Sequence, residues 1–239
     1  MRSIPNQEAI TRNYLALVER LDELTAQHQR LPSSVRLLAV SKTRSVAEIR
    51  AAYAAGARDV GENYLQEALP KRDALNDLED LSWHFIGAIQ SNKTAAIAQQ
   101  FDWVHTLDRT KIAQRLNRQR PAELAPLNVC ININLHDEPS KAGIAPAAMP
   151  ELIASVQDCE RLRLRGLMAI PAVDVPPQES FEALAALFQS AAPASTDAPA
   201  DAPNDWDSLS MGMSGDYAAA IAAGSTMVRI GTALFGPRS

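Results

Sequence analysis

The sequence predicts a single-domain (β/α)8 barrel of the TIM type over residues 1–239, with an extra helix at its N-terminus. Two observations lead to this prediction. Strand-like and helix-like segments alternate eight times along the chain, and its 239 residues come close to the roughly 250 usual for this fold. Successive parallel strands need a crossover between them, usually a helix, so this alternation indicates parallel strands that close into a barrel.

The N-terminal helix and the first strand–helix unit have the clearest local signals. Apolar residues recur at helical spacing between residues 10 and 24, which predicts an amphipathic helix ahead of the barrel. The first strand follows in LLAVSKTR, residues 37–44. Its helix should begin at a capping box, with Ser45 as N-cap and Glu48 three residues later, and should end near Gly56.

The other seven strands are expected where short apolar runs meet turn residues. Helices should follow them near residues 64, 92, 109, 146, 178 and 215, and a short C-terminal piece should follow the last strand. The seven strand segments are RDVGEN (58–63), SWHFIG (82–87), DWVHTLD (102–108), NVCININ (128–134), RLRGLMAI (163–170), DSLSMG (207–212) and MVRIG (227–231).

One segment interrupts this pattern. Residues 190–205, SAAPASTDAPADAPND, are rich in Ala, Pro, Ser and Asp and offer little apolar surface to bury. They connect the sixth helix of the barrel to the seventh strand, and helix-to-strand loops lie at the end of the barrel away from the active face. We therefore expect a flexible insertion without a catalytic role.

Composition and charge exclude several classes of protein. The formal net charge is −5 and the basic residues are scattered, which argues against a nucleic-acid partner. Cys130 and Cys159, expected in a strand and a helix, have the spacing of neither a disulfide framework nor a zinc site. No signal core and no run of about 18 apolar residues occurs, so we expect a cytoplasmic protein without a membrane span and without a metal.

Lys42 directly follows the first strand and should lie on the same side of it as Leu38 and Val40. Active sites of this fold gather at the carboxyl ends of the strands, which places the amine at the barrel mouth. A lysine whose stem packs among apolar residues has a lowered pKa and a nucleophilic amine, as Schiff-base chemistry requires. Taken alone, an exposed lysine that closes a strand would be the commoner interpretation.

The loops after strands seven and eight have the composition of a phosphate site. Barrels that hold a phosphate usually do so between these two loops. The first loop, SMGMSGDY, offers the hydroxyls of Ser210 and Ser214 among glycines, and the second, RIGTALFG, places Gly231 and Thr232 at the start of a short helix. Either loop alone could be an ordinary turn, but the pair occurs at the two expected places.

Arg229 lies within the eighth strand, between apolar neighbours. A buried guanidinium needs an acceptor. Two interpretations stay open: a structural arginine paired with a carboxylate, or a partner for the pyridine nitrogen of pyridoxal phosphate.

Eight segments resemble, in order and spacing, the pyridoxal phosphate homeostasis protein family. They are AVSKTR, GENYLQEALPK, WHFIGAIQSNK, VHTLDR, EPSKAGI, GLMAIP, LSMGMSGDY and GSTMVRIGTALFG. The resemblance implies a barrel similar to the N-terminal domain of alanine racemase, which holds pyridoxal 5′-phosphate as an aldimine on a lysine. It also implies a role in vitamin B6 and amino-acid homeostasis without established turnover, with pyridoxal-phosphate-dependent client enzymes as possible partners.

The resemblance assigns cofactor contacts to eight residues. It places the lysine at Lys42, an asparagine near the ring at Asn63, and the phosphate-binding serine at Ser210, with Met211 and Ser214 beside it. The remaining contacts fall on three residues near the C-terminus: Arg229 facing the ring nitrogen, and Gly231 and Thr232.

Other polar residues near strand ends receive no catalytic role. His84 and His105 have no apparent carboxylate partner in the sequence, and a lone strand histidine is more often a satisfied core group than a base. Lys93 and Lys141 lack an apolar strand to lower their pKa. Glu62 is as well explained by an exposed acid as by a residue that orients its neighbours.

The sequence is compatible with two functions, and a third has less support from its residues. The first is a binding protein that stores or delivers pyridoxal phosphate, and the second is a racemase or decarboxylase that uses it. Racemases add a further domain with a second acid/base, whereas only TALFGPRS follows the last strand here, so we expect the binding protein. A phosphosugar enzyme would use the same phosphate loops but would not need an aldehyde-reactive lysine.

Overall fold

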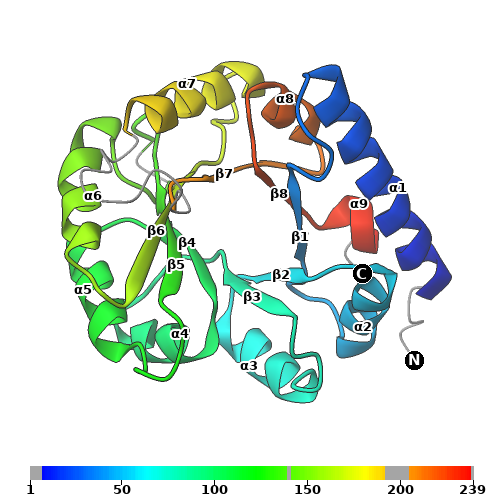
Figure 1. Cartoon of the computed structure of the whole chain (residues 1–239), viewed down its shortest axis with the longest axis horizontal. Coiled ribbons are helices and arrows are strands. Elements are labelled where there is room, and N and C mark those ends of the chain that lie inside the picture. Colours follow the sequence, from blue (N-terminus) through cyan, green and yellow to red (C-terminus); the bar gives the residue numbers. More distant parts are fainter. Residues whose placement is uncertain (1–6, 139–140, 192–204, 238–239) are drawn as a thin grey trace.

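The computed structural model of the chain describes residues 7–138, 141–191 and 205–237. Within them, eight parallel strands form one closed sheet in the order β1 to β8, and β1 pairs with β8 to complete the ring. Helices surround this ring (Figure 1). The predicted (β/α)8 barrel with an extra N-terminal helix is confirmed.

The strands occupy the predicted segments, with small shifts at their ends. They are β1 (Arg36–Val40), β2 (Asp59–Glu62), β3 (Ser82–Phe85), β4 (Trp103–Leu107), β5 (Leu127–Asn132), β6 (Leu162–Met168), β7 (Ser208–Met213) and β8 (Met227–Ile230). The α-helices are α1 (Gln7–Gln27), α2 (Val46–Ala55), α3 (Leu65–Ala74), α4 (Thr94–Gln100), α5 (Thr110–Gln119), α6 (Met149–Gln157), α7 (Pro177–Ser190), α8 (Tyr217–Ala222) and α9 (Thr232–Phe235). Short 3-10 helices, η1 (Ser91–Lys93) and η2 (Pro146–Ala148), precede α4 and α6.

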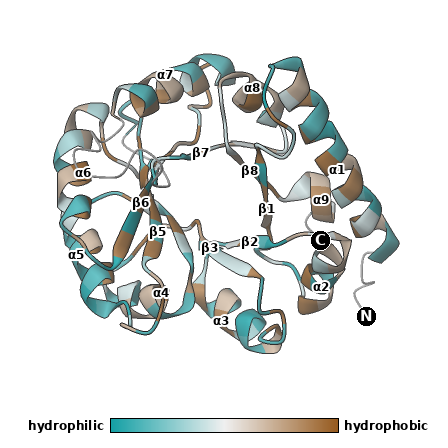
Figure 2. Cartoon of the chain, in the orientation of Figure 1, coloured by the Kyte–Doolittle hydropathy of each residue, from teal (hydrophilic) through white to brown (hydrophobic). Residues whose placement is uncertain are grey.

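The N-terminal helix α1 takes over the covering role that α9 is too short to fill. Helix α9 has four residues, and α1 packs beside it as well as against α2 and α8 (Figure 1). Asn13 donates a hydrogen bond from Nδ2 to the Leu234 carbonyl at 3.0 Å and so ties α1 to α9. The outward side of α1 is largely hydrophilic (Figure 2), as expected for a helix with one buried face.

Side-chain alternation along the strands creates two apolar layers. The larger layer lies between the sheet and the helices and contains Leu37 and Ala39 of β1. The smaller one fills the barrel and contains Leu38 with Trp103, Cys130 and Met168. The predicted period-2 pattern of β1 therefore holds, with Leu38 inside the barrel.

The local sequence signals predicted the ends of α2 correctly, whereas one prediction near α6 was wrong. Ser45 and Glu48 form the predicted capping box, and Gly56 follows the helix with a φ of 121°. Cys130 lies in β5 as predicted, but Cys159 lies just beyond α6 rather than within it. Most of the expected 190–205 insertion, residues 192–204, falls outside the described residues. In the part of the chain that the structure describes, no helix has the length and apolar character to cross a bilayer.

Candidate functional site

A cavity of about 270 Å³ opens at the carboxyl ends of the strands, the end of this fold where sites gather. Six of the eight residues predicted for a cofactor site line it. They are Lys42, Asn63, Ser214, Arg229, Gly231 and Thr232. Val40, Arg44, Ile86, Met168, Ile170, Met213 and Gly215 complete the lining.

Lys42 lies in the turn that follows β1, where its side chain is partly buried. The turn continues through Thr43, whose φ of 65° is unusual for a residue with a β-branched side chain. Glu67 Oε2 accepts a hydrogen bond from the Thr43 backbone N–H at 2.8 Å. This contact stabilises the turn that brings Lys42 to the cavity.

A buried ion pair between Lys71 and Glu62 contacts the residue before Lys42 and stabilises the same turn. Lys71 Nζ lies 2.7 Å from Glu62 Oε1 and donates a hydrogen bond to the Ser41 carbonyl at 2.9 Å. Ser41 Oγ also donates to Glu62 Oε1, at 2.6 Å. Burial raises the pKa of Glu62 above its ordinary value, although the bonds from Lys71 and Ser41 act in the opposite direction. Glu62 is therefore not the exposed acid that the sequence left possible, and Lys71 was missed because helical position alone does not indicate burial.

Asn63 reaches the cavity through a close approach of two loops. A Cβ added at Gly87 would lie 2.0 Å from the Asn63 carbonyl oxygen, so this contact between the loops after β2 and β3 requires glycine. Asn63 Oδ1 is buried and has no hydrogen-bond partner among the described residues. A buried acceptor without a partner is uncommon in folded proteins.

The loops after β7 and β8 meet at the cavity as predicted. Ser214 and Gly215 come from the first loop, and Gly231 and Thr232 come from the second. The Ala233 N–H donates to Ser214 Oγ at 3.3 Å and joins the two loops. Hydroxyls and small residues at this place match the usual phosphate site of such barrels.

Ser210 and Met211, the other two residues expected to contact the cofactor, do not line the cavity. The pairing of β7 with β8 shifts between Ser210 and Met213, at a bulge where Gly212 has a φ of 95°. Before the bulge, Ser210 points into the barrel interior and Met211 into the layer under the helices. The bulge brings Ser214, rather than Ser210, to the cavity.

Arg229 is buried at the base of the cavity and held by three acceptors. Its Nη1 donates to the Ser210 carbonyl at 2.7 Å and to Ser210 Oγ at 2.9 Å, and its Nη2 donates to the Ala169 carbonyl at 3.1 Å. None of these acceptors is a carboxylate. Burial lowers the pKa of Arg229 to about 10, which leaves it cationic at neutral pH.

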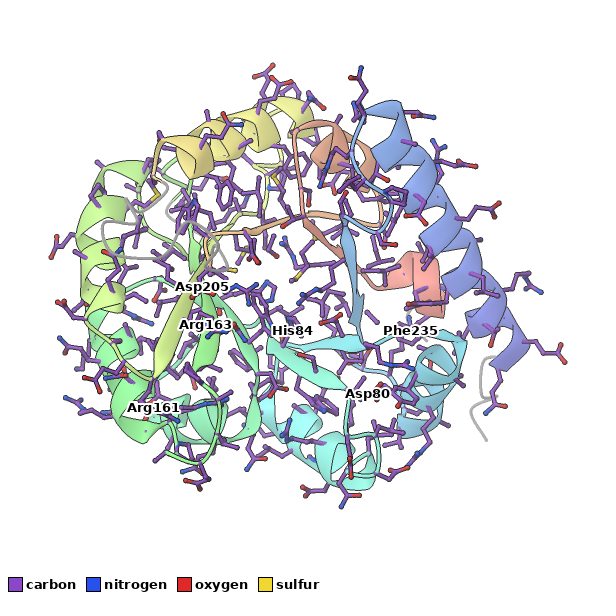
Figure 3. All side chains as sticks on the ribbon, viewed as in Figure 1. Asp80, His84, Arg161, Arg163, Asp205 and Phe235 are labelled. Atoms are coloured by element: carbon purple, nitrogen blue, oxygen red, sulfur yellow. The ribbon has the colours of Figure 1, made fainter. Side chains whose placement is uncertain are left out.

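The two strand histidines belong to a chain of hydrogen bonds that the sequence did not indicate. His84 on β3, labelled in Figure 3, lies 2.9 Å from His105 Nε2 through its Nδ1 and 2.8 Å from Asp59 Oδ1 through its Nε2. His105 Nδ1 lies 2.8 Å from Ser210 Oγ. His84 therefore has a carboxylate partner, Asp59, which the sequence pattern did not reveal. Burial lowers the pKa of both histidines, and that of His105 well below its ordinary value.

Arg44 was not singled out from the sequence, although it belongs to the AVSKTR segment. It lines the cavity and is almost fully buried. Its guanidinium donates to the carbonyls of Gly236 and Pro237 and lies 3.4 Å from Glu48 Oε1. Arg44 therefore fixes the end of α9 against α2, next to the loop that carries Thr232.

The competing lysines and the two cysteines are not among the residues that line the cavity. Lys141 donates to the Pro171 carbonyl at 2.7 Å and pairs with Glu138 at 2.8 Å. Lys93 ends η1 and is not part of the cavity lining. Burial raises the pKa of Cys130 to about 12, so this thiol is a packing residue inside the barrel. The described residues contain no group of three or more His, Cys, Asp or Glu side chains that could hold a metal ion.

Comparison with known proteins shows the class of barrel to which the chain belongs. Residues 8–239 match the family model described as alanine racemase, N-terminal domain. An alanine racemase from E. faecalis shares the fold at a TM-score of 0.66 and 20% identity, and the match covers 97% of this chain and 58% of that one. The chain therefore has the barrel of this class.

Closer relatives define the family within that class. The pyridoxal phosphate homeostasis protein of Pseudomonas aeruginosa is 52% identical over 229 residues, with 96% of each chain covered. PipY of Synechococcus elongatus, solved with PLP bound, is 36% identical with a TM-score of 0.72, and the match covers 90% of this chain and all of that one. This chain belongs to the pyridoxal phosphate homeostasis protein family.

Proposed function

We propose that the protein binds pyridoxal 5′-phosphate in the cavity at the barrel mouth and acts in the homeostasis of this cofactor. The observation that carries the proposal is the content of one cavity: a lysine at the end of β1, a buried arginine from β8, and two loops of small and hydroxyl residues. These are the groups needed for an aldehyde, a pyridine nitrogen and a phosphate. The names of the relatives and the PLP bound to PipY support the same cofactor.

The residues present fit the parts of the cofactor. Ser214, Gly215, Gly231 and Thr232 would hold the phosphate, because hydroxyls and exposed backbone N–H groups suit an anion. Arg229 would donate a hydrogen bond to the ring nitrogen from an N–H group that has no acceptor among the described residues. Asn63, whose Oδ1 has no partner among the residues that the structure describes, would lie beside the ring.

Lys42 would hold the cofactor covalently as a Schiff base. The cofactor would supply an aldehyde, and the uncharged Lys42 amine would add to its carbon and give up both amine hydrogens to the water that carries away the aldehyde oxygen. The turn held by Glu67, Lys71 and Glu62 keeps the amine at the cavity for this step. A reversible linkage of this kind suits storage and release. Delivery to pyridoxal-phosphate-dependent client enzymes and a cytoplasmic location belong to the same proposal.

The phosphate assignment leads to a prediction that compares two ligands. Ser214→Ala and Thr232→Ala should each weaken pyridoxal 5′-phosphate binding by about tenfold to a hundredfold, because each removes a hydrogen bond to a charged group. Affinity for pyridoxal, which lacks the phosphate, should stay unchanged. Spectrophotometric titration of the wild type and both variants with the two ligands measures this. Equal losses for both ligands would place the phosphate elsewhere.

A racemase or decarboxylase of the same barrel class is the second candidate. When bound, pyridoxal phosphate stabilises a carbanion next to the amino-acid nitrogen, and it does so best with a protonated ring nitrogen. Arg229 has no acceptor and can only donate to that nitrogen, which opposes its protonation. Among the described residues that line the cavity there is no carboxylate, histidine, tyrosine or cysteine to act as a second acid/base. These observations favour binding over turnover.

We expect the cofactor-loaded protein to exchange the α-protons of L- and D-amino acids more slowly than about 1 s⁻¹, the lower end of ordinary enzyme turnover. NMR of a panel of amino acids in heavy water measures the rate, with an alanine racemase as the positive control. Exchange at or above that rate, lost in Lys42→Ala, would establish the enzyme instead.

A further inference from the structure

A series of side-chain hydrogen bonds runs through the inside of the barrel and connects the two ends of the barrel. Asp59 begins β2 at the N-terminal end of the barrel, and Arg229 lies at the base of the cavity. Between them, hydrogen-bonding contacts run from Asp59 to His84 at 2.8 Å, to His105 at 2.9 Å, to Ser210 at 2.8 Å and to Arg229 at 2.9 Å. Each residue comes from a different strand, so the chain crosses β2, β3, β4, β7 and β8.

The chemistry of the two end groups sets the direction of every bond. Arg229 can only donate, so Ser210 Oγ accepts from it, and the acceptor that the relay offers to the Ser210 hydroxyl hydrogen is His105 Nδ1. His105 then carries its proton on Nε2 and donates to His84 Nδ1. His84 in turn carries its proton on Nε2 and donates to the Asp59 carboxylate. All bonds therefore point from Arg229 toward Asp59, and both histidines are neutral.

The reverse arrangement would leave two conflicts. If His105 carried its proton on Nδ1, Ser210 Oγ could accept it with its second lone pair, but the Ser210 hydroxyl hydrogen would then have no acceptor among the relay residues. His84 would then present an unprotonated Nε2 to the Asp59 carboxylate at 2.8 Å. The tautomers of the two histidines and the orientation of the Ser210 hydroxyl are therefore coupled.

The surroundings of the chain exclude water along most of its length. His84, His105 and Ser210 are fully buried. Trp103 stacks on His84 with ring centroids 5.3 Å apart and 8° between the planes. Arg36 and Arg165 lie over the Trp103 ring at 5.3 and 4.8 Å, which closes the barrel below the histidines. In such surroundings each unmade hydrogen bond is costly, so the direction of the chain is strongly enforced.

We propose that Asp59, His84, His105 and Ser210 form a one-way hydrogen-bond relay that positions Arg229 as a donor toward the ring nitrogen of the bound cofactor. The inference rests on the proposed binding of pyridoxal 5′-phosphate in the cavity. Ser210 is the member that touches Arg229, and the histidines act through it. Both hydrogens of Arg229 Nη1 are taken up by Ser210, which leaves Nε–H and one hydrogen of Nη2 for other acceptors.

The first test needs neither cofactor nor substitution. Nitrogen-15 NMR of histidine-labelled, cofactor-free protein at neutral pH reports which ring nitrogen carries the proton. We expect His84 and His105 both to be neutral with the proton on Nε2. A proton on Nδ1 of either ring, or a protonated ring, would overturn the relay whether or not the cavity binds pyridoxal phosphate.

The second test determines whether the relay affects binding of the ring nitrogen or of the phosphate. Ser210→Ala and His105→Leu should each weaken pyridoxal and pyridoxal 5′-phosphate by the same factor, on the order of tenfold, because both ligands share the ring nitrogen. The absorption maximum of the bound ligand should shift in both variants. Cys130→Ala, which changes the barrel interior outside the relay, serves as the matched control and should alter neither affinity nor spectrum.

The possible outcomes separate the relay from its alternatives. A loss in Ser210→Ala that is confined to pyridoxal 5′-phosphate would make Ser210 a phosphate ligand and overturn the relay. Unchanged affinities and spectra in a folded Ser210→Ala variant would also overturn it, because the relay acts through that hydroxyl. If the wild type binds neither ligand, the proposed function fails, and the histidine tautomers still decide whether the one-way chain exists.

Discussion

Replacing Lys42 with alanine should abolish covalent capture of pyridoxal 5′-phosphate. The amine at the end of β1 is the nucleophile that the cavity offers, and its removal leaves the phosphate and ring contacts in place. The visible absorption band of the Schiff base should therefore disappear, while weaker non-covalent binding persists. Because Lys42 lies in a partly exposed turn, the free energy of unfolding should change by about 1 kcal/mol or less.

Borohydride reduction followed by peptide mapping measures this result directly. In the wild type, the reduced pyridoxyl label should map to the peptide that contains Lys42, and in Lys42→Ala the label should be absent. Lys93→Ala and Lys141→Ala are matched controls from outside the cavity and should be labelled like the wild type. A label on Lys93 or Lys141 would contradict the assignment.

Replacing Lys71 with methionine should cause the largest loss of stability, roughly 3 kcal/mol at slightly alkaline pH, because it leaves Glu62 as a buried charge without its partner. The loss should depend on pH. The pKa of Glu62 is already raised in the folded protein, so folding favours its neutral form more than the unfolded chain does. As the pH rises through the raised pKa of Glu62, this residue becomes charged and the folded state loses stability. Removal of Lys71 raises the pKa of Glu62 further. Near pH 4.5 the penalty should therefore be small.

Urea unfolding of the wild type and Lys71→Met across this pH range measures the effect. The double variant Glu62→Gln/Lys71→Met is the matched control, because it removes both charges and should recover most of the stability at high pH. A loss in Lys71→Met that is the same at low and high pH, or no recovery in the double variant, would show that the ion pair does not act as described. Since Lys71 also holds the Ser41 carbonyl, Lys71→Met should weaken cofactor binding at Lys42 as well.

Much of the cavity lining could be predicted because its residues stand next to local landmarks. Lys42, Asn63 and Thr232 directly follow or closely succeed strand ends, and strand ends are visible in the apolar pattern. The barrel then places all such positions at one mouth. The family resemblance added the assignments for the ring and the phosphate. It could not correct for the bulge at Gly212, because a bulge changes which side chains face inward without changing the order of the motifs.

What the sequence by itself determined is the order of strands and helices, the closure into a barrel, and the place of Lys42, since each follows from periodicity over a few neighbouring residues. The tertiary structure alone decided that Ser214 rather than Ser210 reaches the cavity, that Lys71 pairs with Glu62, and that the histidines are joined to Asp59 and Arg229. The partners in that relay stand 25, 21, 105 and 19 positions apart in the chain. Contacts over such separations depend on the register between strands and on bulges such as the one in β7, and local sequence patterns do not encode these.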